Sequence, residues 1–243
     1  MAQELGDHRA RQVCLDIGKT ILHQASRKRY GMVAHDDHAI FAIADTCYFV
    51  ASPLMMASVL ERSNGMAFRE QALYQLRTYI DMFLTSDRGL SKTILLEDGL
   101  GKTYWTRASG WLLWAINGVL RRLPPAEAQF KGLCHDLRRL AEGIAGVQDS
   151  SGGFHVLLDD PTTPLETTGS AMFATGLHEG VRRGWLPGSF VDTANRAWKF
   201  VENNITPEGK ILQVYTGWAV PAENRVMSMD EHRMDSRHDP AGR

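Results

Sequence analysis

The sequence lacks the charge excess, the long apolar run and the signal peptide that mark several large protein classes. Its 27 Lys and Arg residues against 28 Asp and Glu residues give a formal net charge of −1, whereas an electrostatic nucleic-acid binder has a basic excess. The best candidate for a membrane span, residues 39–56, is interrupted by polar residues and a proline. The first twelve residues are polar and charged, unlike a signal peptide. We therefore expect a cytoplasmic protein with neither a nucleic-acid nor a membrane partner.

Cysteine is scarce as well, and several catalytic motifs are missing. The three cysteines, Cys14, Cys47 and Cys134, are widely spaced and form no CxxC pair. We expect buried thiols of a reducing compartment rather than disulfides or a zinc site. The sequence contains no GxSxG, P-loop or dinucleotide fingerprint, which excludes the corresponding enzyme classes. No cofactor and no metal are expected.

What the sequence does contain is helical periodicity, within a composition that is 44% hydrophobic. Apolar residues recur at helical spacing in seven segments. We expect helices over residues 8–26, 45–62, 67–84, 111–123, 126–147, 167–184 and 189–204. Pro53 should kink the second of these helices. No long strand is expected.

Three glycine turns suggest a repeat. Gly89, Gly153 and Gly209 each follow a long predicted helix and lie 64 and 56 residues apart. A period near 60 that holds two helices and a turn is typical of stacked helix hairpins, which must close on one another as a toroid or solenoid. We expect an all-α fold with about four helix pairs, short of a closed ring. The exposed apolar faces of an open ring predict self-association.

One helix start combines two tryptophans with an arginine. Indole rings stack on the apolar faces of sugars, and a guanidinium pairs with a carboxylate. Trp105, Arg107 and Trp111 are therefore suited to an acidic sugar. The alternative interpretation is that both tryptophans belong to the core and the arginine is a structural partner.

Other candidate residues each have a structural alternative. Asp45 is a lone carboxylate in an apolar stretch; burial would make it a general acid, whereas exposure would make it a helix N-cap. The run His35–His38 looks like a metal cluster, but its spacing favours a solvated loop from which His35 alone faces a site. His155 is either a loop histidine or a cleft residue. Glu166 and two threonines precede a predicted helix, and capping would explain Thr167 and Thr168 without any function.

Four segments resemble the unsaturated glucuronyl and rhamnogalacturonyl hydrolases, glycoside hydrolase families 88 and 105. Residues 104–111, YWTRASGW, resemble the W-x-R-x-x-G-W signature of these families. Residues 148–160 are similar to their Q-D-x-x-G-x-W-H-x-x-L-D-D loop, with Phe154 in place of tryptophan, and residues 165–174 to their helix start Y-L-E-T-S-G-S-A-M-F-A. The stretch around Asp45 and Pro53 is similar to W-x-D-x-x-x-x-x-x-P-F-L. The resemblance covers about residues 10–220.

This resemblance implies an (α/α)6 barrel and an unusual hydrolysis. The substrate would be the 4,5-unsaturated uronic acid that a polysaccharide lyase leaves at the non-reducing end of a pectin or rhamnogalacturonan oligosaccharide. A carboxylic acid protonates C4 of the vinyl ether, water adds at C5, and the hemiketal opens and releases the next sugar. Because the step is a hydration, the carboxylate-spacing rule of ordinary glycosidases does not apply.

The resemblance also implies roles for individual residues. The general acid falls on Asp45, and the substrate-binding positions fall on a further set: His35, Trp105, Arg107, Trp111, His155 and Glu166. Thr93 stands where the families have a histidine. The first and last barrel helices are expected to be missing, which leaves one partial barrel domain over residues 1–243 with a polar, disordered tail at 226–243. The alternatives are an inactive relative that binds acidic sugars or a partner, and an isomerase or epimerase on a similar barrel.

Overall fold

Helices dominate the structure, a computed structural model that describes residues 7–35, 42–61, 63, 65–85, 87–96 and 99–215. The helices are α1 (His8–His23), α2 (Thr46–Leu60), α3 (Gly65–Phe83), α4 (Thr106–Leu120), α5 (Ala128–Gly146), α6 (Thr167–Arg182) and α7 (Phe190–Asn203), with a short 3-10 turn at Arg29–Gly31. All seven expected helices are present, and the predicted all-α class is confirmed. The largest shift is at α4, which begins five residues before the expected start at 111.

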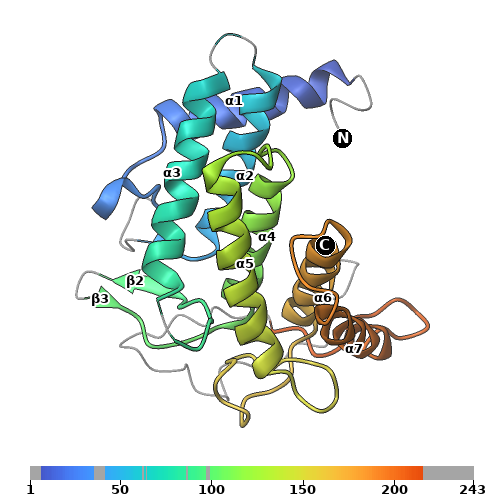
Figure 1. The fold of residues 1–243 in the computed structure, drawn as a ribbon. Coiled ribbons are helices and arrows are strands. Elements are labelled where there is room, and N and C mark those ends of the chain that lie inside the picture. The colour runs from blue at the N-terminus through green and yellow to red at the C-terminus, as the bar shows by residue number, and fades with distance from the viewer. Residues whose placement is uncertain are drawn as a thin grey trace, which may run out of the picture.

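The helices pack as consecutive hairpins, as the repeat predicted. α2 packs on α3, α4 on α5 and α6 on α7, while α2, α4 and α6 also pack on one another in sequence (Figure 1). We call α2, α4 and α6 the central row. Two glycines of α4 make its close approaches possible, because a Cβ on Gly110 would lie 3.0 Å from Met172 of α6 and one on Gly118 would lie 2.5 Å from Ser52 of α2.

The turn glycines have equivalent positions in successive hairpins. Gly89 has a φ of +67°, and a Cβ there would collide with the carbonyl oxygen of Arg139 on α5. Gly152 has a φ of +89°, and a Cβ there would lie 2.5 Å from the carbonyl oxygen of Arg196 on α7. Each turn therefore packs against the second helix of the next hairpin. The predicted repeat position Gly153 needs correction by one residue, since Gly152 has the left-handed conformation.

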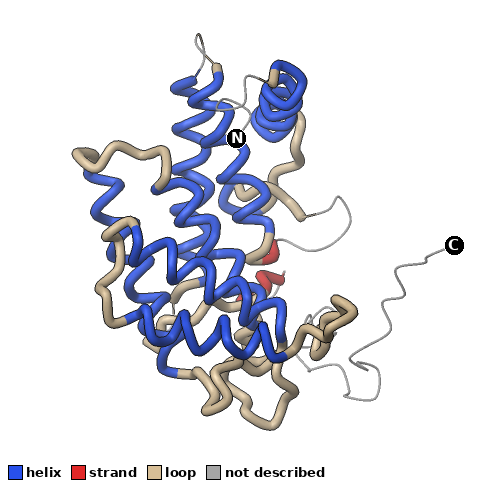
Figure 2. Tube along the Cα trace, turned by 90° about the vertical axis from the view of Figure 1, so that its right-hand side faces the viewer, coloured by secondary structure: helices blue, strands red, loops and turns tan. Residues whose placement is uncertain are grey.

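A small antiparallel sheet closes one end of the helices. Its strands, β1 (Ala42–Ile43), β2 (Ile94–Leu96) and β3 (Gly99–Leu100), are ordered β1-β2-β3, with Leu95 opposite both Ala42 and Leu100. Figure 2 shows how short these strands are beside the helices. The Ala44 amide donates to the Thr93 carbonyl at 3.0 Å, immediately after β1. The sheet thus fixes the chain just before Asp45.

Buried residues from all seven helices form one connected core. Cys47 is buried in it, but Cys14 and Cys134 are only partly buried, so the prediction of three buried thiols is wrong for those two. All three are free thiols. Within the described segments, no helix has the length and apolarity needed to cross a membrane.

Two sequence-based predictions fall outside the described residues. These are the histidine-aspartate run beyond His35, residues 36–38, and the polar tail at 226–243. Elsewhere in the described chain, no three His, Cys, Asp or Glu side chains gather as a possible metal site.

Candidate active site

The starts of the three helices of the central row meet at a cleft of about 660 Å³. His35 and Asp45 lie at the start of α2, Trp105 and Arg107 at the start of α4, and Thr167 and Thr168 at the start of α6. The remaining lining is mostly apolar and consists of Phe49, Trp111, Trp114, Ala171, Met172, Thr175, Val201, Ile205 and Ile211. Helix N-termini carry unpaired N–H groups and a partial positive charge. The starts of α2 and α4 at one cleft favour an anionic ligand, whereas the first amides of α6 are already paired, with the Glu166 carboxylate among their acceptors.

Asp45 presents a buried carboxyl group to this cleft. Its backbone is helical (φ −54°, ψ −40°), and its side chain makes no capping hydrogen bond to α2. Its Oδ1 atom is buried and has no hydrogen-bond partner among the described residues. Burial raises the pKa of Asp45 to about 6, although the positive charge of Arg107 partly opposes the shift. The geometry therefore favours an acid over the N-cap alternative.

Arg107 is held by an aromatic ring and a backbone carbonyl. Its guanidinium lies 4.3 Å from the centroid of the Trp105 ring, and it donates to the Tyr215 carbonyl at 2.6 Å. The Trp105 amide in turn donates to the Thr93 hydroxyl at 3.1 Å. Thr93 is fully buried and positions this segment of the site.

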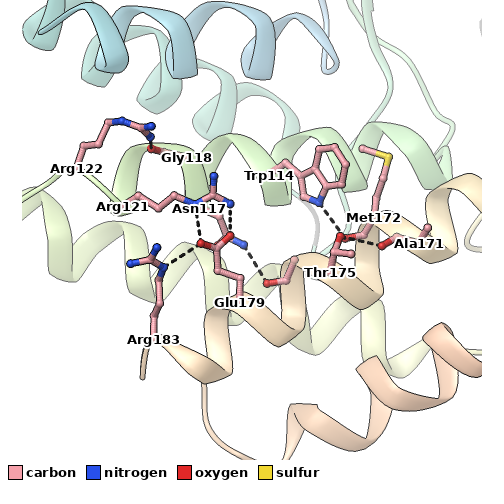
Figure 3. Close-up of polar contacts among 11 residues, drawn as sticks. Trp114, Asn117, Gly118, Arg121, Arg122, Ala171, Met172, Thr175, Glu179 and Arg183 are labelled. Atoms are coloured by element: carbon pink, nitrogen blue, oxygen red, sulfur yellow. Dashed lines mark hydrogen bonds and ion pairs between the residues drawn. The ribbon is translucent and has the colours of Figure 1, made fainter. Parts of the chain in front are cut away.

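The aromatic wall is larger than the sequence indicated. Trp111 packs against Phe49 and Trp114, with ring centroids 4.9 and 5.6 Å away. The indole N–H of Trp114 donates to the Met172 carbonyl at 3.1 Å, as Figure 3 shows. Sequence reasoning missed Phe49 and Trp114 as lining residues. The three-residue spacing from Trp111 to Trp114, which places both on one helix face, was the available signal.

His35 also lies in the cleft, where its side chain is fixed to the first turn of α2. Its Nδ1 atom lies 2.8 Å from the hydroxyl of Thr46, the residue that follows Asp45. The structure therefore brings His35, Asp45, Trp105, Arg107 and Trp111 together.

Glu166 and His155 are not brought into this lining. Glu166 is fully buried, and its carboxylate accepts hydrogen bonds from the amides of Thr168 and Gly169. Glu166 therefore caps α6, a role that the sequence suggested for the two threonines instead. The Nδ1 atom of His155 lies 2.5 Å from the Thr163 carbonyl, within the loop before α6. Neither side chain is among the residues that line the cleft, and their contact with substrate stays a prediction.

The segment 211–215 forms one side of the site, and sequence reasoning missed it. It is fixed to the start of α6, because the Thr167 amide donates to the Gln213 carbonyl at 2.9 Å and the Thr167 hydroxyl to the Leu212 carbonyl at 2.7 Å. Gln213 itself has a φ of +52°. A non-glycine residue persists in this conformation only where its surroundings hold it.

Polar contacts fix α4 against α6 beyond the cleft (Figure 3). The amide nitrogen of Asn117 donates to the Gly176 carbonyl at 2.9 Å, and Arg121 Nε lies 2.5 Å from Glu179. These contacts set the relative position of the two helices, and therefore of Trp111 and Ala171 across the cleft.

Comparisons with known proteins agree with this fold. The model of Glycosyl Hydrolase Family 88 matches residues 1–236. The unsaturated rhamnogalacturonyl hydrolase YesR of Bacillus subtilis is 26% identical over 225 residues, which are 88% of this chain and 63% of YesR. The solved structures of possible GH105 members from Klebsiella pneumoniae and Salmonella enterica superpose on this chain with TM-scores of 0.81 and 0.79, both at 26% identity. The matches cover 89% and 86% of this chain, respectively, and 58% of each solved chain.

The chain thus spans less than two thirds of these relatives, and the matched part contains the helix pairs and the cleft described above. The family match extends over nearly the whole sequence. The chain belongs to Glycosyl Hydrolase Family 88.

Proposed function

We propose that the chain is a glycoside hydrolase that removes the 4,5-unsaturated uronic acid from lyase-generated oligosaccharides of pectin or rhamnogalacturonan type. The observation that carries the proposal is the shared cleft of Asp45, Arg107 and the tryptophans. The names of two relatives support the substrate class. One is an unsaturated rhamnogalacturonyl hydrolase, and the other is an unsaturated 3S-rhamnoglycuronyl hydrolase of an Alteromonas species, 27% identical over 112 residues.

Arg107 is the group that binds the uronate carboxylate. A guanidinium pairs with a carboxylate through two parallel hydrogen bonds, and the helix N-termini around it add a favourable field. The rings of Trp105 and Trp111 offer apolar faces to the sugar. His35, beside Thr46, contacts the sugar hydroxyls close to the reacting atoms.

Asp45 supplies the proton for the reaction. With a pKa of about 6, about a tenth of the carboxyl groups hold a proton at pH 7. The proton passes to C4 of the vinyl ether, and the positive charge that develops at C5 is shared with the ring oxygen. Water adds at C5 and returns one proton to Asp45, and the resulting hemiketal opens and releases the next sugar. One water is consumed and the acid is regenerated.

The alternative is a family member that binds acidic sugars without converting them. What favours it is Thr93, which stands where the resemblance to the family implies a histidine. A lyase-generated unsaturated disaccharide separates the two functions. Loss of the absorbance of its conjugated double bond supports the hydrolase, whereas calorimetric binding with unchanged absorbance supports the sugar-binding protein. The three free thiols fit a cytoplasmic location for either function.

A further inference from the structure

The exposed face of α6 leads out of the cleft. Thr168, Ala171, Thr175, His178 and Arg182 are all at least partly exposed and recur every three or four residues, so they form one stripe along the helix. The first three line the cleft, and the last three line a second groove of about 950 Å³. Thr175 belongs to both, so the two cavities adjoin along α6.

Arginines dominate this second groove, which we call the arginine groove. Arg121 and Arg122 come from the end of α4, and Arg182 and Arg183 from the end of α6. Figure 3 shows Arg121 and Arg183 directed at Glu179, whereas Arg122 is directed at Gly118. The opposite wall is formed by α7, from which Trp198 projects with 43% of its surface exposed.

The positive charge of the groove is only partly compensated. Among the described lining residues Glu179 is the sole carboxylate, and it already binds Arg121 and Arg183, the latter at 2.9 Å. Arg122 donates to the Gly118 carbonyl at 2.9 Å, and Arg182 has no polar partner within the described chain. Burial and the neighbouring Arg121 lower the pKa of Arg122. Arg182 is thus available to an anion, and Arg122 adds a second guanidinium group to the lining.

A structural role accounts for part of this cluster. Cations at helix C-termini offset the helix dipole, and Arg121 and Arg183 are the C-cap residues of α4 and α6. That role is already filled by the two arginines that share Glu179. It does not explain a second arginine at each helix end, or the exposed indole that faces them.

We propose that the arginine groove is a second subsite, which binds a further acidic group of the same oligosaccharide that enters the cleft. It combines arginine with tryptophan, as the cleft does, and a guanidinium suits a sugar carboxylate. Fourteen residues separate Thr168 from Arg182, which is about 21 Å along a helix. The ligand is therefore an extended acidic oligosaccharide, longer than a disaccharide. This inference rests on the proposed function for the position of the unsaturated end.

Binding measurements test the subsite without relying on turnover. We would titrate hexagalacturonate and an unsaturated disaccharide into the wild type, into Arg122→Gln/Arg182→Gln, and into Arg138→Gln/Arg196→Gln. The last variant removes the same charge from exposed i,i+4 ion pairs outside the groove. The groove variant should bind hexagalacturonate at least about tenfold more weakly and the disaccharide unchanged. The control should bind both as the wild type does.

Several results would overturn the inference. One is an equal loss of affinity for both ligands in the groove variant, and another is an unchanged affinity of that variant for hexagalacturonate. A third is a wild type that binds hexagalacturonate no more tightly than the disaccharide. Polyglutamate that binds the groove in place of the hexamer would indicate an acidic protein partner instead. The single variant Arg182→Lys keeps the positive charge, so it should bind hexagalacturonate with most of the wild-type affinity. A large loss of affinity in this variant would also count against the inference. A wild type that binds the oligosaccharides but does not convert them would count against the proposed function, and the comparison of binding affinities would still test the subsite.

Discussion

The guanidinium of Arg107 donates a 2.6 Å hydrogen bond to the carbonyl of Tyr215, a residue 108 positions away in the chain. The Tyr215 amide lies 3.5 Å from the buried carboxylate of Glu166, which also caps α6. Arg107 is thus positioned through a backbone segment fixed to α6, the next helix of the central row. Glu166 acts on the site through this segment, without contacting the cleft.

Gln213 tests this positioning, because its side chain is exposed and only its backbone conformation connects it to the site. A β-branched residue at φ +52° is strained by about 1–3 kcal/mol. Gln213→Val should therefore displace the segment and weaken uronate binding several-fold in calorimetry. Gln213→Asn tolerates the left-handed conformation and should bind as the wild type does. Equal affinities for the two variants would show that the segment does not position Arg107.

Arg107→Ala tests the anion-binding role directly. A charge-assisted hydrogen bond contributes roughly 1.5–3 kcal/mol, so the affinity for an unsaturated uronide should fall about 10- to 100-fold. The affinity for a neutral sugar of the same size should change much less. Parallel calorimetric titrations measure both losses, and equal losses would support a purely structural arginine.

The raised pKa of Asp45 predicts a dependence of stability on pH. The folded carboxyl titrates at about 6 and the unfolded one at about 3.9, so the folded state binds more protons between these values. The contribution of Asp45 to stability is therefore full below about pH 4 and is lost as pH rises through 6, a change of about 3 kcal/mol.

Asp45→Asn lacks this titration, so it should be as stable as the wild type near pH 4 and more stable near pH 7. Urea unfolding of both proteins at the two pH values measures the difference. A constant difference across this range would mean that the carboxyl group is not buried as described.

Gly89 tests the packing of the turns against the next hairpin. Gly184 also has a positive φ, of +71°, but a Cβ there would meet no atom within 4 Å. Gly184→Ala should therefore cost only the conformational penalty, about 1–2 kcal/mol. Gly89→Ala adds the collision with Arg139 and should cost clearly more in thermal or urea unfolding. Equal costs would argue against close packing of this turn on α5.

The helices and much of the cleft could be predicted because the signals are local. Apolar spacing located the seven helices, and turn glycines revealed the hairpin repeat. Asp45, Trp105, Arg107 and Trp111 lie within short motifs at helix starts, and the parallel helices of the central row bring those starts together.

The other features of the site depend on contacts between residues far apart in the sequence. No local signal connects Tyr215 to Arg107, and the left-handed conformation of Gln213 results from hydrogen bonds with α6. Glu166 stands in a motif whose threonines were the expected caps, and only the fold shows that its buried carboxylate caps α6. The arginine groove forms where the ends of α4 and α6 meet. Arg121 and Glu179, which pair there, lie 58 residues apart in the sequence.

The turnover of an unsaturated disaccharide by Asp45→Asn, compared with the wild type, tests the central claim most directly. Asparagine keeps the size of the side chain but carries no acidic proton, and general acid catalysis contributes about 10²–10⁴-fold. We predict that the wild type abolishes the absorbance of the conjugated double bond. The folded variant, with a melting temperature no lower than that of the wild type, should do so at least about a hundredfold more slowly. An Asp45→Asn protein that keeps most of the wild-type rate would contradict the assignment of Asp45 as the acid.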